Sequence, residues 1–219
     1  MVELPLFPLN IVLFPGMLLP LHIFEERYKA MINDCLENGS PFGVLLSDLE
    51  EEEVDPPYSV GTTAHIVQLD KLEDGRMNII VLGRQRFRVQ HTLRREPYLV
   101  ADVEFYPLRA GDPRENRERT LRVRNLFGAY VDLLGKAMGT RLHVQRVPNT
   151  PLTLAYLVAI VLQTSLDEKQ QLLELPTYSD LLRQEEILLN REKALLTYIL
   201  ETQPKEEDLW PYRPQFSLN

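Results

Sequence analysis

Residues 4–28 read LPLFPLNIVLFPGMLLPLHIFEERY, and this opening stretch decides how the rest of the chain is interpreted. Two short apolar segments interrupted by prolines lead to the dipeptide Pro15-Gly16, and a third apolar segment follows. Proline has no N–H and a fixed φ, so these segments are expected to form short strands at sheet edges or strand starts. Pro15-Gly16 suits a tight turn, because proline presets the first corner and glycine accepts a positive φ at the second.

From Phe24 onward the apolar residues recur with helical spacing. They are Phe24, Tyr28, Met31, Ile32, Cys35 and Leu36. These positions share one face of a helix, and Gly39 is placed to end it. Cys35, the only cysteine, lies in this stripe, so we interpret it as a core residue rather than a reactive thiol.

The clearest hairpin is predicted for 60–72 and 76–89, joined at Asp74-Gly75, which is the preferred dipeptide of a type I′ turn. In its second strand, alternation places Ile80 and Leu82 on the outward face, followed by the arginines at 84, 86 and 88. Two adjacent outward aliphatic residues suggest that something covers Ile80 and Leu82. A further strand is expected at 98–106, and it would bring Asp102 and Glu104 opposite the arginines.

Strand signals end near residue 110 and helical periodicity replaces them. We expect a helix over about 113–138 and a second one with Thr150 as its N-cap and Pro151 at its first position. A capping box of Ser165 and Glu168 predicts a short third helix, and Thr177 with Asp180 starts a long last one. The predicted organisation is therefore a β-rich unit over 1–110, a helical bundle over 111–203 and an extended tail over 204–219. The acidic run at 50–53 is expected to be an exposed loop.

Several motifs are similar to one known family. They are Leu4–Leu9, the Leu-Phe-Pro-Gly of 13–16, the Leu-Pro-Leu-His-Ile-Phe of 19–24 with Glu25, Arg27 and Tyr28, and the later runs 42–44, 60–62 and 83–87. Together these residues resemble the Lon protease N-terminal (substrate-binding) domain, in its stand-alone bacterial form without ATPase and protease modules. The resemblance implies an α+β fold, a small PUA-like bent antiparallel β-barrel followed by a C-terminal helical bundle. We interpret the motif residues as structural: Pro15, Gly16, His22, Glu25, Arg27, Gly61 and Gly83.

The sequence shows no arrangement of residues typical of catalysis or metal binding. No Gly-x-Ser-x-Gly motif and no P-loop is present, and the four histidines are scattered, with no zinc-binding pattern. We therefore expect a protein that is not an enzyme and that has no cofactor, no metal and no catalytic residue. There is no basic segment followed by an apolar run at the N-terminus, and the apolar run at 152–162 is too short for a bilayer, so we expect a cytoplasmic protein with no membrane partner.

Two functions stay open. The resemblance implies a polypeptide-binding module, an adaptor or chaperone-like protein that recognises unfolded or tagged segments. Its further partner would be a larger protease or chaperone. Its binding site would lie in the cleft between the two units, with Ile80 and Leu82 close to it. The alternative is an RNA-binding PUA-like protein, supported only by the arginines at 84–88 and 114–124. A net charge of −8 and a pI near 5.1 make a nucleic-acid partner the weaker hypothesis.

Overall fold

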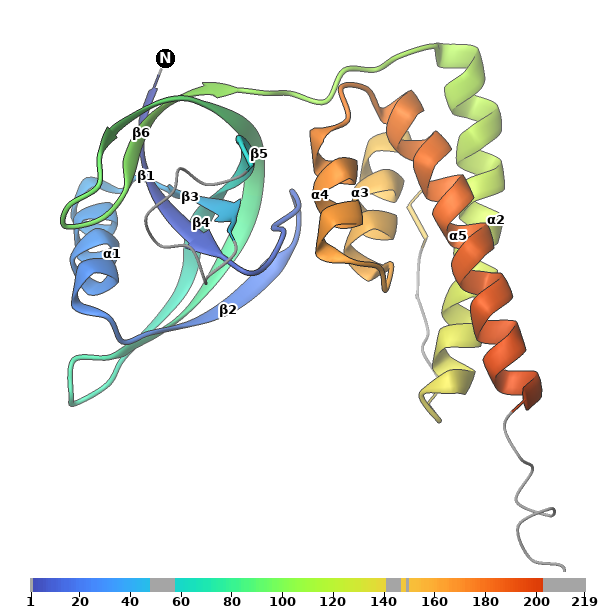
Figure 1. Cartoon of the computed structure of the whole chain (residues 1–219), viewed down its shortest axis with the longest axis horizontal. Helices are drawn as coiled ribbons and strands as arrows, with labels where there is room; N and C mark the ends of the chain where they lie inside the picture. Colours follow the sequence, from blue (N-terminus) through green and yellow to red (C-terminus); the bar gives the residue numbers. More distant parts are fainter. Residues whose placement is uncertain (1, 48–57, 141–146, 149, 203–219) are drawn as a thin grey trace, which may run out of the picture.

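The computed structural model describes residues 2–47, 58–140, 147–148 and 150–202, and Figure 1 shows a β-barrel beside a group of helices. The barrel strands are β1 (Val2–Leu9), β2 (Leu18–Ile23), β3 (Phe42–Leu46), β4 (Val60–Lys71), β5 (Met77–Arg94) and β6 (Val100–Phe105). Helix α1 (Glu26–Asn38) lies against the barrel and ends, as predicted, at Gly39, which adopts a left-handed conformation with φ 60°. The predicted loop at 48–57 and tail at 204–219 fall outside the described residues.

The sheet runs in the order β2-β5-β4-β3-β1-β6, and a second pairing of β5 with β6 closes a ring. Strand β5 is long enough to pair with β2 through its first half and with β6 through its second half. Strand β2 lies outside the ring, on the edge of β5. The predicted α+β barrel fold is confirmed, and one strand pair departs from the predicted antiparallel arrangement. Strands β1 and β3 are parallel, which is possible because β2 and α1 supply the long crossover between them.

The barrel interior depends on glycines that leave room for large side chains. Alternation along β5 buries Met77, Ile79 and Val81, as expected for its core face. Phe87, on the same strand, is completely buried. A Cβ built on Gly61 would lie 2.7 Å from Phe87 Cζ and 2.3 Å from the Val44 carbonyl oxygen, closer than any side chain tolerates. Gly61 therefore fixes how closely β4 approaches the ring of Phe87.

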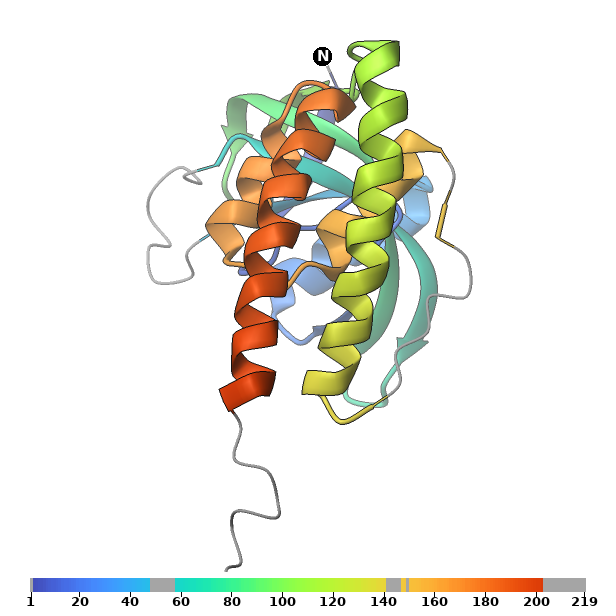
Figure 2. The ribbon, with the colours of Figure 1, turned by 90° about the vertical axis from the view of Figure 1, so that its right-hand side faces the viewer.

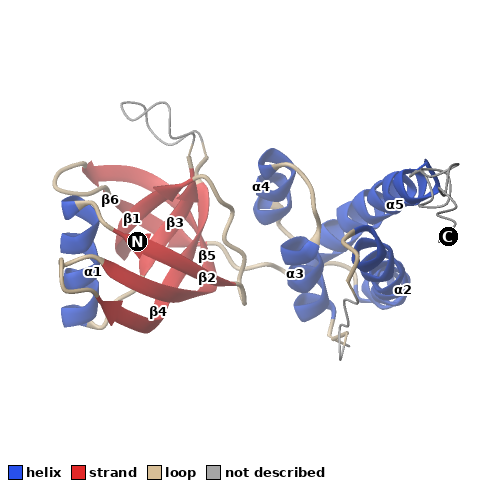
Figure 3. Cartoon of the chain, turned by 90° about the horizontal axis from the view of Figure 1, so that it is seen from below, coloured by secondary structure: helices blue, strands red, loops and turns tan. Residues whose placement is uncertain are grey.

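The helical part begins with α2 (Pro113–Ala137), continues through α3 (Pro151–Val161) and α4 (Leu166–Glu174), and ends with α5 (Tyr178–Thr202). Each helix begins within a few residues of its predicted start. Figure 2 shows α2 and α5 side by side as two long helices, and Figure 3 places α3 and α4 nearer the barrel. Strand β6 ends and α2 begins on either side of the expected boundary near residue 110.

The barrel and the helices share one hydrophobic cluster. Val12, Phe14, Leu46 and Val60 of the barrel pack in the same cluster as the buried leucines of α3, α4 and α5. All four barrel side chains are nearly inaccessible to solvent. The two parts are thus joined by a common apolar interface and not only by the covalent connection.

Candidate functional site

An exposed apolar surface covers the outer face of β2 and β5. Register pairs Leu18 with Leu82 and Pro20 with Ile80, so these side chains point to the same side of the sheet. Leu18 is 59% exposed, whereas Ile80 and Leu82 are half-buried. We call this surface the β2–β5 patch; its residues are Leu18, Pro20, Phe24, Val67, Ile80 and Leu82. Phe24, which follows β2 and alternates with Leu18 and Pro20, is 59% exposed. Val67 of β4, at the bulge next to the Gln68–Ile80 pair, is 52% exposed.

The two predicted binding residues therefore lie on an apolar surface, although not at the place expected for them. Ile80 and Leu82 are not part of the hydrophobic cluster that the barrel shares with the helices. The side chains beside them come from β2 instead, which covers them in part. Leu18 and Phe24 were not predicted as binding residues, although alternation along 18–24 puts both on one face, together with Pro20 and His22.

The interface between barrel and helices is organised by Arg86. Its Nη1 donates hydrogen bonds to the carbonyl oxygens of Leu173 (2.5 Å) and Leu175 (2.7 Å), and its Nε donates to the Tyr106 carbonyl oxygen (3.1 Å). Leu173 and Leu175 stand at the end of α4, where carbonyl groups have no partners within the helix. A barrel arginine thus caps the C-terminus of a helix, the end that favours positive charge.

Arg86 was predicted to face Asp102 and Glu104 together with Arg84. Its side chain is only 3% exposed and turns to the helices. Strand pairing places Glu104 opposite Arg88. Strand β5 has a bulge just before Arg86: Thr62 pairs with Arg86 and Ala64 with Gly83, so β5 has one more residue than β4 between these two pairs. Such an extra residue bends the strand locally. Other contacts hold the same interface: Gln170 donates to the Val60 carbonyl oxygen (3.0 Å) and Tyr58 to Asp167 (2.6 Å).

Three of the motif residues meet at one turn. The Gly16 N–H donates to the Gly83 carbonyl oxygen (2.8 Å), and the Gly83 N–H donates to the carbonyl oxygen of Met17 (2.9 Å). Gly16 has a φ of 86°, and Pro15 precedes it in the turn. A Cβ on Gly83 would lie 2.4 Å from the carbonyl oxygen of Phe14. These residues fix the loop before β2 against β5, and so position the first strand of the patch.

Three more motif residues, His22, Glu25 and Arg27, lie at the end of β2 and around the start of α1, whereas Gly61 lies in β4. His22 bonds through Nδ1 to Asn78 Oδ1 (2.7 Å) across the two strands. Glu25 precedes the helix, and its carboxylate accepts a hydrogen bond from Arg27 Nε (2.8 Å). The Arg27 guanidinium also lies 4.8 Å from the centre of the Tyr28 ring. These contacts order the chain where β2 passes into α1, next to the exposed Phe24.

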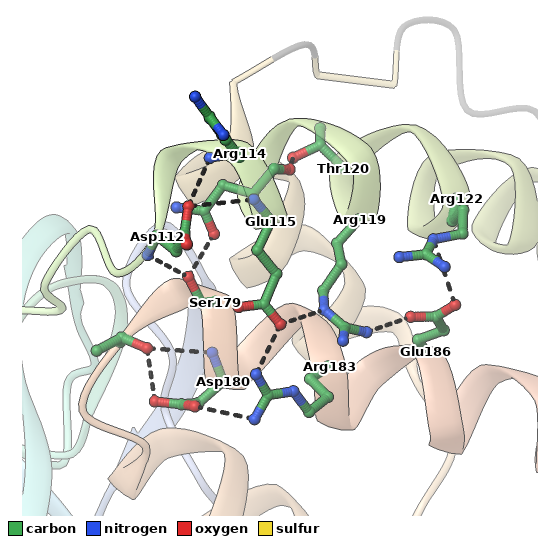
Figure 4. A network of polar contacts seen from close by, with 12 residues as sticks. Asp112, Arg114, Glu115, Arg119, Thr120, Arg122, Ser179, Asp180, Arg183 and Glu186 are labelled. Atoms are coloured by element: carbon green, nitrogen blue, oxygen red, sulfur yellow. Dashed lines mark hydrogen bonds and ion pairs between the residues drawn. The ribbon is translucent and has the colours of Figure 1, made fainter.

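Two arginines of α2, Arg119 and Arg122, are engaged by carboxylates, as Figure 4 shows. Arg119 contacts Glu115 (2.9 Å) and reaches across to Glu186 of α5 (2.6 Å). Arg183 contacts Glu115 from the other side (2.6 Å), and these hydrogen bonds lower the pKa of the Glu115 carboxyl group. Arg122 lies 3.7 Å from Glu186. This network joins α2 to α5 and leaves less positive charge available to a phosphate backbone than the sequence suggested.

Within the described residues, no group of three or more histidine, cysteine or carboxylate side chains is arranged to hold a metal ion. A membrane-spanning helix, one both long and apolar enough to cross a bilayer, does not occur in the described part of the chain.

The family model of the ATP-dependent protease La (LON) substrate-binding domain matches residues 3–191. The chain belongs to this family. The Lon protease of Anaeromyxobacter dehalogenans is 31% identical over 199 residues, which are 88% of this chain and 24% of that protein. Lon protease 2 of Syntrophobacter fumaroxidans is 33% identical over 181 residues, 80% of this chain and 22% of its own length. The chain thus spans about a quarter of the Lon proteases that it matches.

Solved structures show the same fold. A Lon N-terminal domain protein from Xanthomonas campestris superposes with a TM-score of 0.61 at 26% identity, covering 93% of this chain and all of that one. The N-terminal domain of the Mycobacterium avium complex Lon protease gives a TM-score of 0.67 at 19% identity, and the match covers 86% of this chain and 98% of that one. The resemblance based on the opening motifs is therefore confirmed at the level of family and fold.

Buried polar residues at the helices of this Lon domain were missed from the sequence. Glu185 of α5 is completely buried, and neither of its carboxylate oxygens has a hydrogen-bond partner among the residues that the structure describes. Burial raises the pKa of Glu185 well above its usual value. The signal was available, because 185 and 192 continue the spacing of Leu181 and Leu188 along the buried face.

Proposed function

We propose that this Lon substrate-binding domain is a non-enzymatic module that binds extended apolar segments of other polypeptides on the β2–β5 patch. The observation that carries the proposal is a set of exposed and half-buried aliphatic and aromatic side chains on one face of two paired strands. Leu18 and Leu82 face each other across the pair, with Phe24 further along the same face. Apolar surfaces of this kind on a protein are typical of interaction sites.

Side-chain contacts, rather than strand addition, are the proposed mode of recognition. Strand β2 is an edge strand, which is where an extended partner would add to the sheet. Pro20 lies in the middle of β2 and has no N–H, so it removes one backbone donor and discourages continuous pairing along that edge. The patch itself provides aliphatic and aromatic contacts that require no fixed register.

The test is binding of a permanently unfolded protein, reduced and carboxymethylated, measured by fluorescence anisotropy. The double variant L18S/L82S removes two facing aliphatic side chains, and we expect its affinity to fall about ten-fold, equivalent to about 1.4 kcal/mol. The matched control is Leu121→Ser on α2, because Leu121 is 61% exposed and lies outside the patch. Equal affinities of the wild type and the double variant would refute the patch as the binding surface.

A chaperone-like or adaptor role is the finer part of the proposal. A module that only holds apolar segments should suppress aggregation of an unfolding protein in a ratio-dependent way, without nucleotide. An adaptor should in addition raise the rate at which a larger protease degrades the bound protein. Both effects should be lost in L18S/L82S. An effect that this variant retains would not depend on the patch.

A further inference from the structure

A second concave surface lies where the barrel meets the helices, and we call it the junction groove. Its volume is about 370 Å³, and its walls come from β5, from the end of β6 with the segment that follows it, and from α3. The residues that carry the argument are Arg84, Phe105, Tyr106, Leu152 and Tyr156. Ligand pockets range from about 300 to 1,000 Å³, so the groove fits a few residues of an extended segment.

Aromatic and aliphatic side chains form the walls of the junction groove. Phe105 is 44% exposed and Leu152 is 41% exposed, so each presents apolar surface that an occupant would cover. The ring of Tyr106 is held in place: the guanidinium carbons of Arg86 and Arg88 lie 4.7 and 4.2 Å from its centre. Its hydroxyl donates to a carbonyl oxygen at the end of α4 (3.2 Å). This wall is fixed before anything binds, which lowers the entropic cost of binding.

The accessible polar groups of the groove are mainly hydrogen-bond donors. The Tyr156 hydroxyl makes no hydrogen bond to the described residues, and it is accessible, since the buried polar atoms that lack partners belong to other residues. Burial raises the pKa of Tyr156, so the hydroxyl keeps its proton at neutral pH and can donate it. Arg84 is exposed, and no carboxylate of the described residues lies within ion-pair distance of it. The Tyr106 carbonyl oxygen, in contrast, already accepts from Arg86 Nε.

Such a lining favours a proline-rich segment over other extended segments. Proline packs an apolar ring against aromatic walls and has no N–H, so it requires no acceptor from the groove. In the polyproline II conformation the carbonyl groups bond to nothing within the segment, and one of them can accept from the Tyr156 hydroxyl. Segments of other residues bring an N–H at every position, and burying these groups without acceptors costs free energy. Aromatic-lined grooves are the surfaces on which proline-rich segments dock.

Charge adds a preference for an acidic residue beside the prolines. Arg84 at the groove and Arg88 on the ring of Tyr106 place positive charge there. Glu104 lies opposite Arg88 in the strand pairing and offsets part of this charge, which leaves Arg84 as the available cation. Because Arg84 is exposed, an ion pair with it contributes little, so the acidic residue tunes the affinity and the apolar walls supply most of it.

We propose that the junction groove docks a proline-rich segment of a partner protein in the polyproline II conformation, with prolines against Phe105, Leu152 and Tyr156 and an acidic residue towards Arg84. The proposal goes beyond the proposed function, because it names a second surface and a different partner chemistry. The β2–β5 patch would hold apolar side chains of unfolded segments, whereas the groove would bind a motif whose conformation is formed beforehand.

The test uses the full chain and a labelled, end-blocked peptide of sequence EPPLPPLPP in fluorescence anisotropy. The comparison peptide has every proline replaced by alanine, which keeps an apolar side chain at each position and restores the N–H groups. We expect the proline peptide to bind about ten-fold more tightly. Equal binding of the two peptides would overturn the proposal, because the surface would then accept apolar segments in general.

Variants of the groove locate the bound peptide. Leu152→Ser removes an apolar wall and should weaken binding about five-fold, whereas Leu121→Ser, at an exposed position of α2, should not change it. Tyr156→Phe removes only the hydroxyl and should weaken binding about three- to five-fold, with Tyr198→Phe on α5 as its control. Unchanged binding in both Leu152→Ser and Tyr156→Phe would refute the groove as the site.

Arg84→Gln tests the charge preference. In the wild type, replacing the peptide's glutamate by glutamine should weaken binding about two-fold, and this difference should disappear in Arg84→Gln. The patch is tested separately, since binding of the proline peptide should persist in L18S/L82S. Loss of binding in that variant with no effect of Leu152→Ser would assign the peptide to the patch and overturn the proposal, while the proposed function of the patch would stand.

Discussion

Glu185 gives a quantitative test of how the helices are packed. Its side chain is completely buried, and neither carboxylate oxygen has a hydrogen-bond partner among the described residues. Burial raises its pKa well above the usual value for a glutamate, because an ionised carboxylate loses its hydration there. At a pH between the unfolded and the folded pKa, the folded protein therefore holds a proton that the unfolded chain has released.

The sign of the effect follows from proton binding in the two states. Between the unfolded and the folded pKa the native state binds more protons, so the free energy of unfolding decreases as pH rises. The decrease is about 1.4 kcal/mol for each pH unit within that interval. Glu185→Gln keeps the size and removes the titration, so this loss should be missing from the variant.

The measurement is urea unfolding followed by circular dichroism at pH 5, 6 and 7. The free energy of unfolding of Glu185→Gln, minus that of the wild type, should increase with pH, while the contributions of other groups cancel in the difference. Glu185→Met should be more stable than either at pH 7, because it also removes the unsatisfied polar group. Glu201→Gln, at an exposed position of the same helix, is the control. A difference that is constant with pH would refute the buried, protonated state of Glu185.

Three further outcomes are expected. Gly61→Ala should destabilise the barrel by about 1–3 kcal/mol in urea unfolding, because its Cβ would collide with Val44 and Phe87; an unchanged midpoint would contradict the close approach. Burial raises the pKa of the Cys35 thiol to about 11, so Cys35 should react with a disulfide reagent at pH 8 only after the protein unfolds. Rapid labelling of the native protein would contradict this burial. Asp112→Ala should cost about 1 kcal/mol, since its side chain accepts from the N–H groups at the start of α2; no change in thermal unfolding would show that this cap is dispensable.

Local chemistry explains why the order and extent of the elements could be predicted. Gly39 ends α1 in the expected left-handed conformation, and Asp74-Gly75 joins β4 and β5. The Ser165 hydroxyl accepts from the Glu168 N–H, as the predicted capping box requires. Thr150 precedes α3 as expected, although its hydroxyl contacts Thr153 and not a backbone N–H. These signals depend on a few neighbouring residues, which a sequence displays directly.

The position of the site could not be obtained in the same way, because it depends on which strands become neighbours. Alternation showed that Ile80 and Leu82 face outward, but not that β2 pairs beside them and brings Leu18 and Pro20 to the same face. Arg86 was read correctly as outward-facing in its strand. Its burial results from the helices that pack on that side, which no local pattern reveals.

The contact of Arg86 with α4 joins the two parts of the chain. The barrel supplies the cap of a bundle helix, and the bundle supplies the burial of a barrel cation, so each part completes a group that the other leaves unsatisfied. Val12 and Phe14 add an apolar contact in the segment that leads into β2, where Gly16 and Gly83 anchor the turn. The helices therefore help to fix the segment before β2, the strand that carries Leu18 and Pro20.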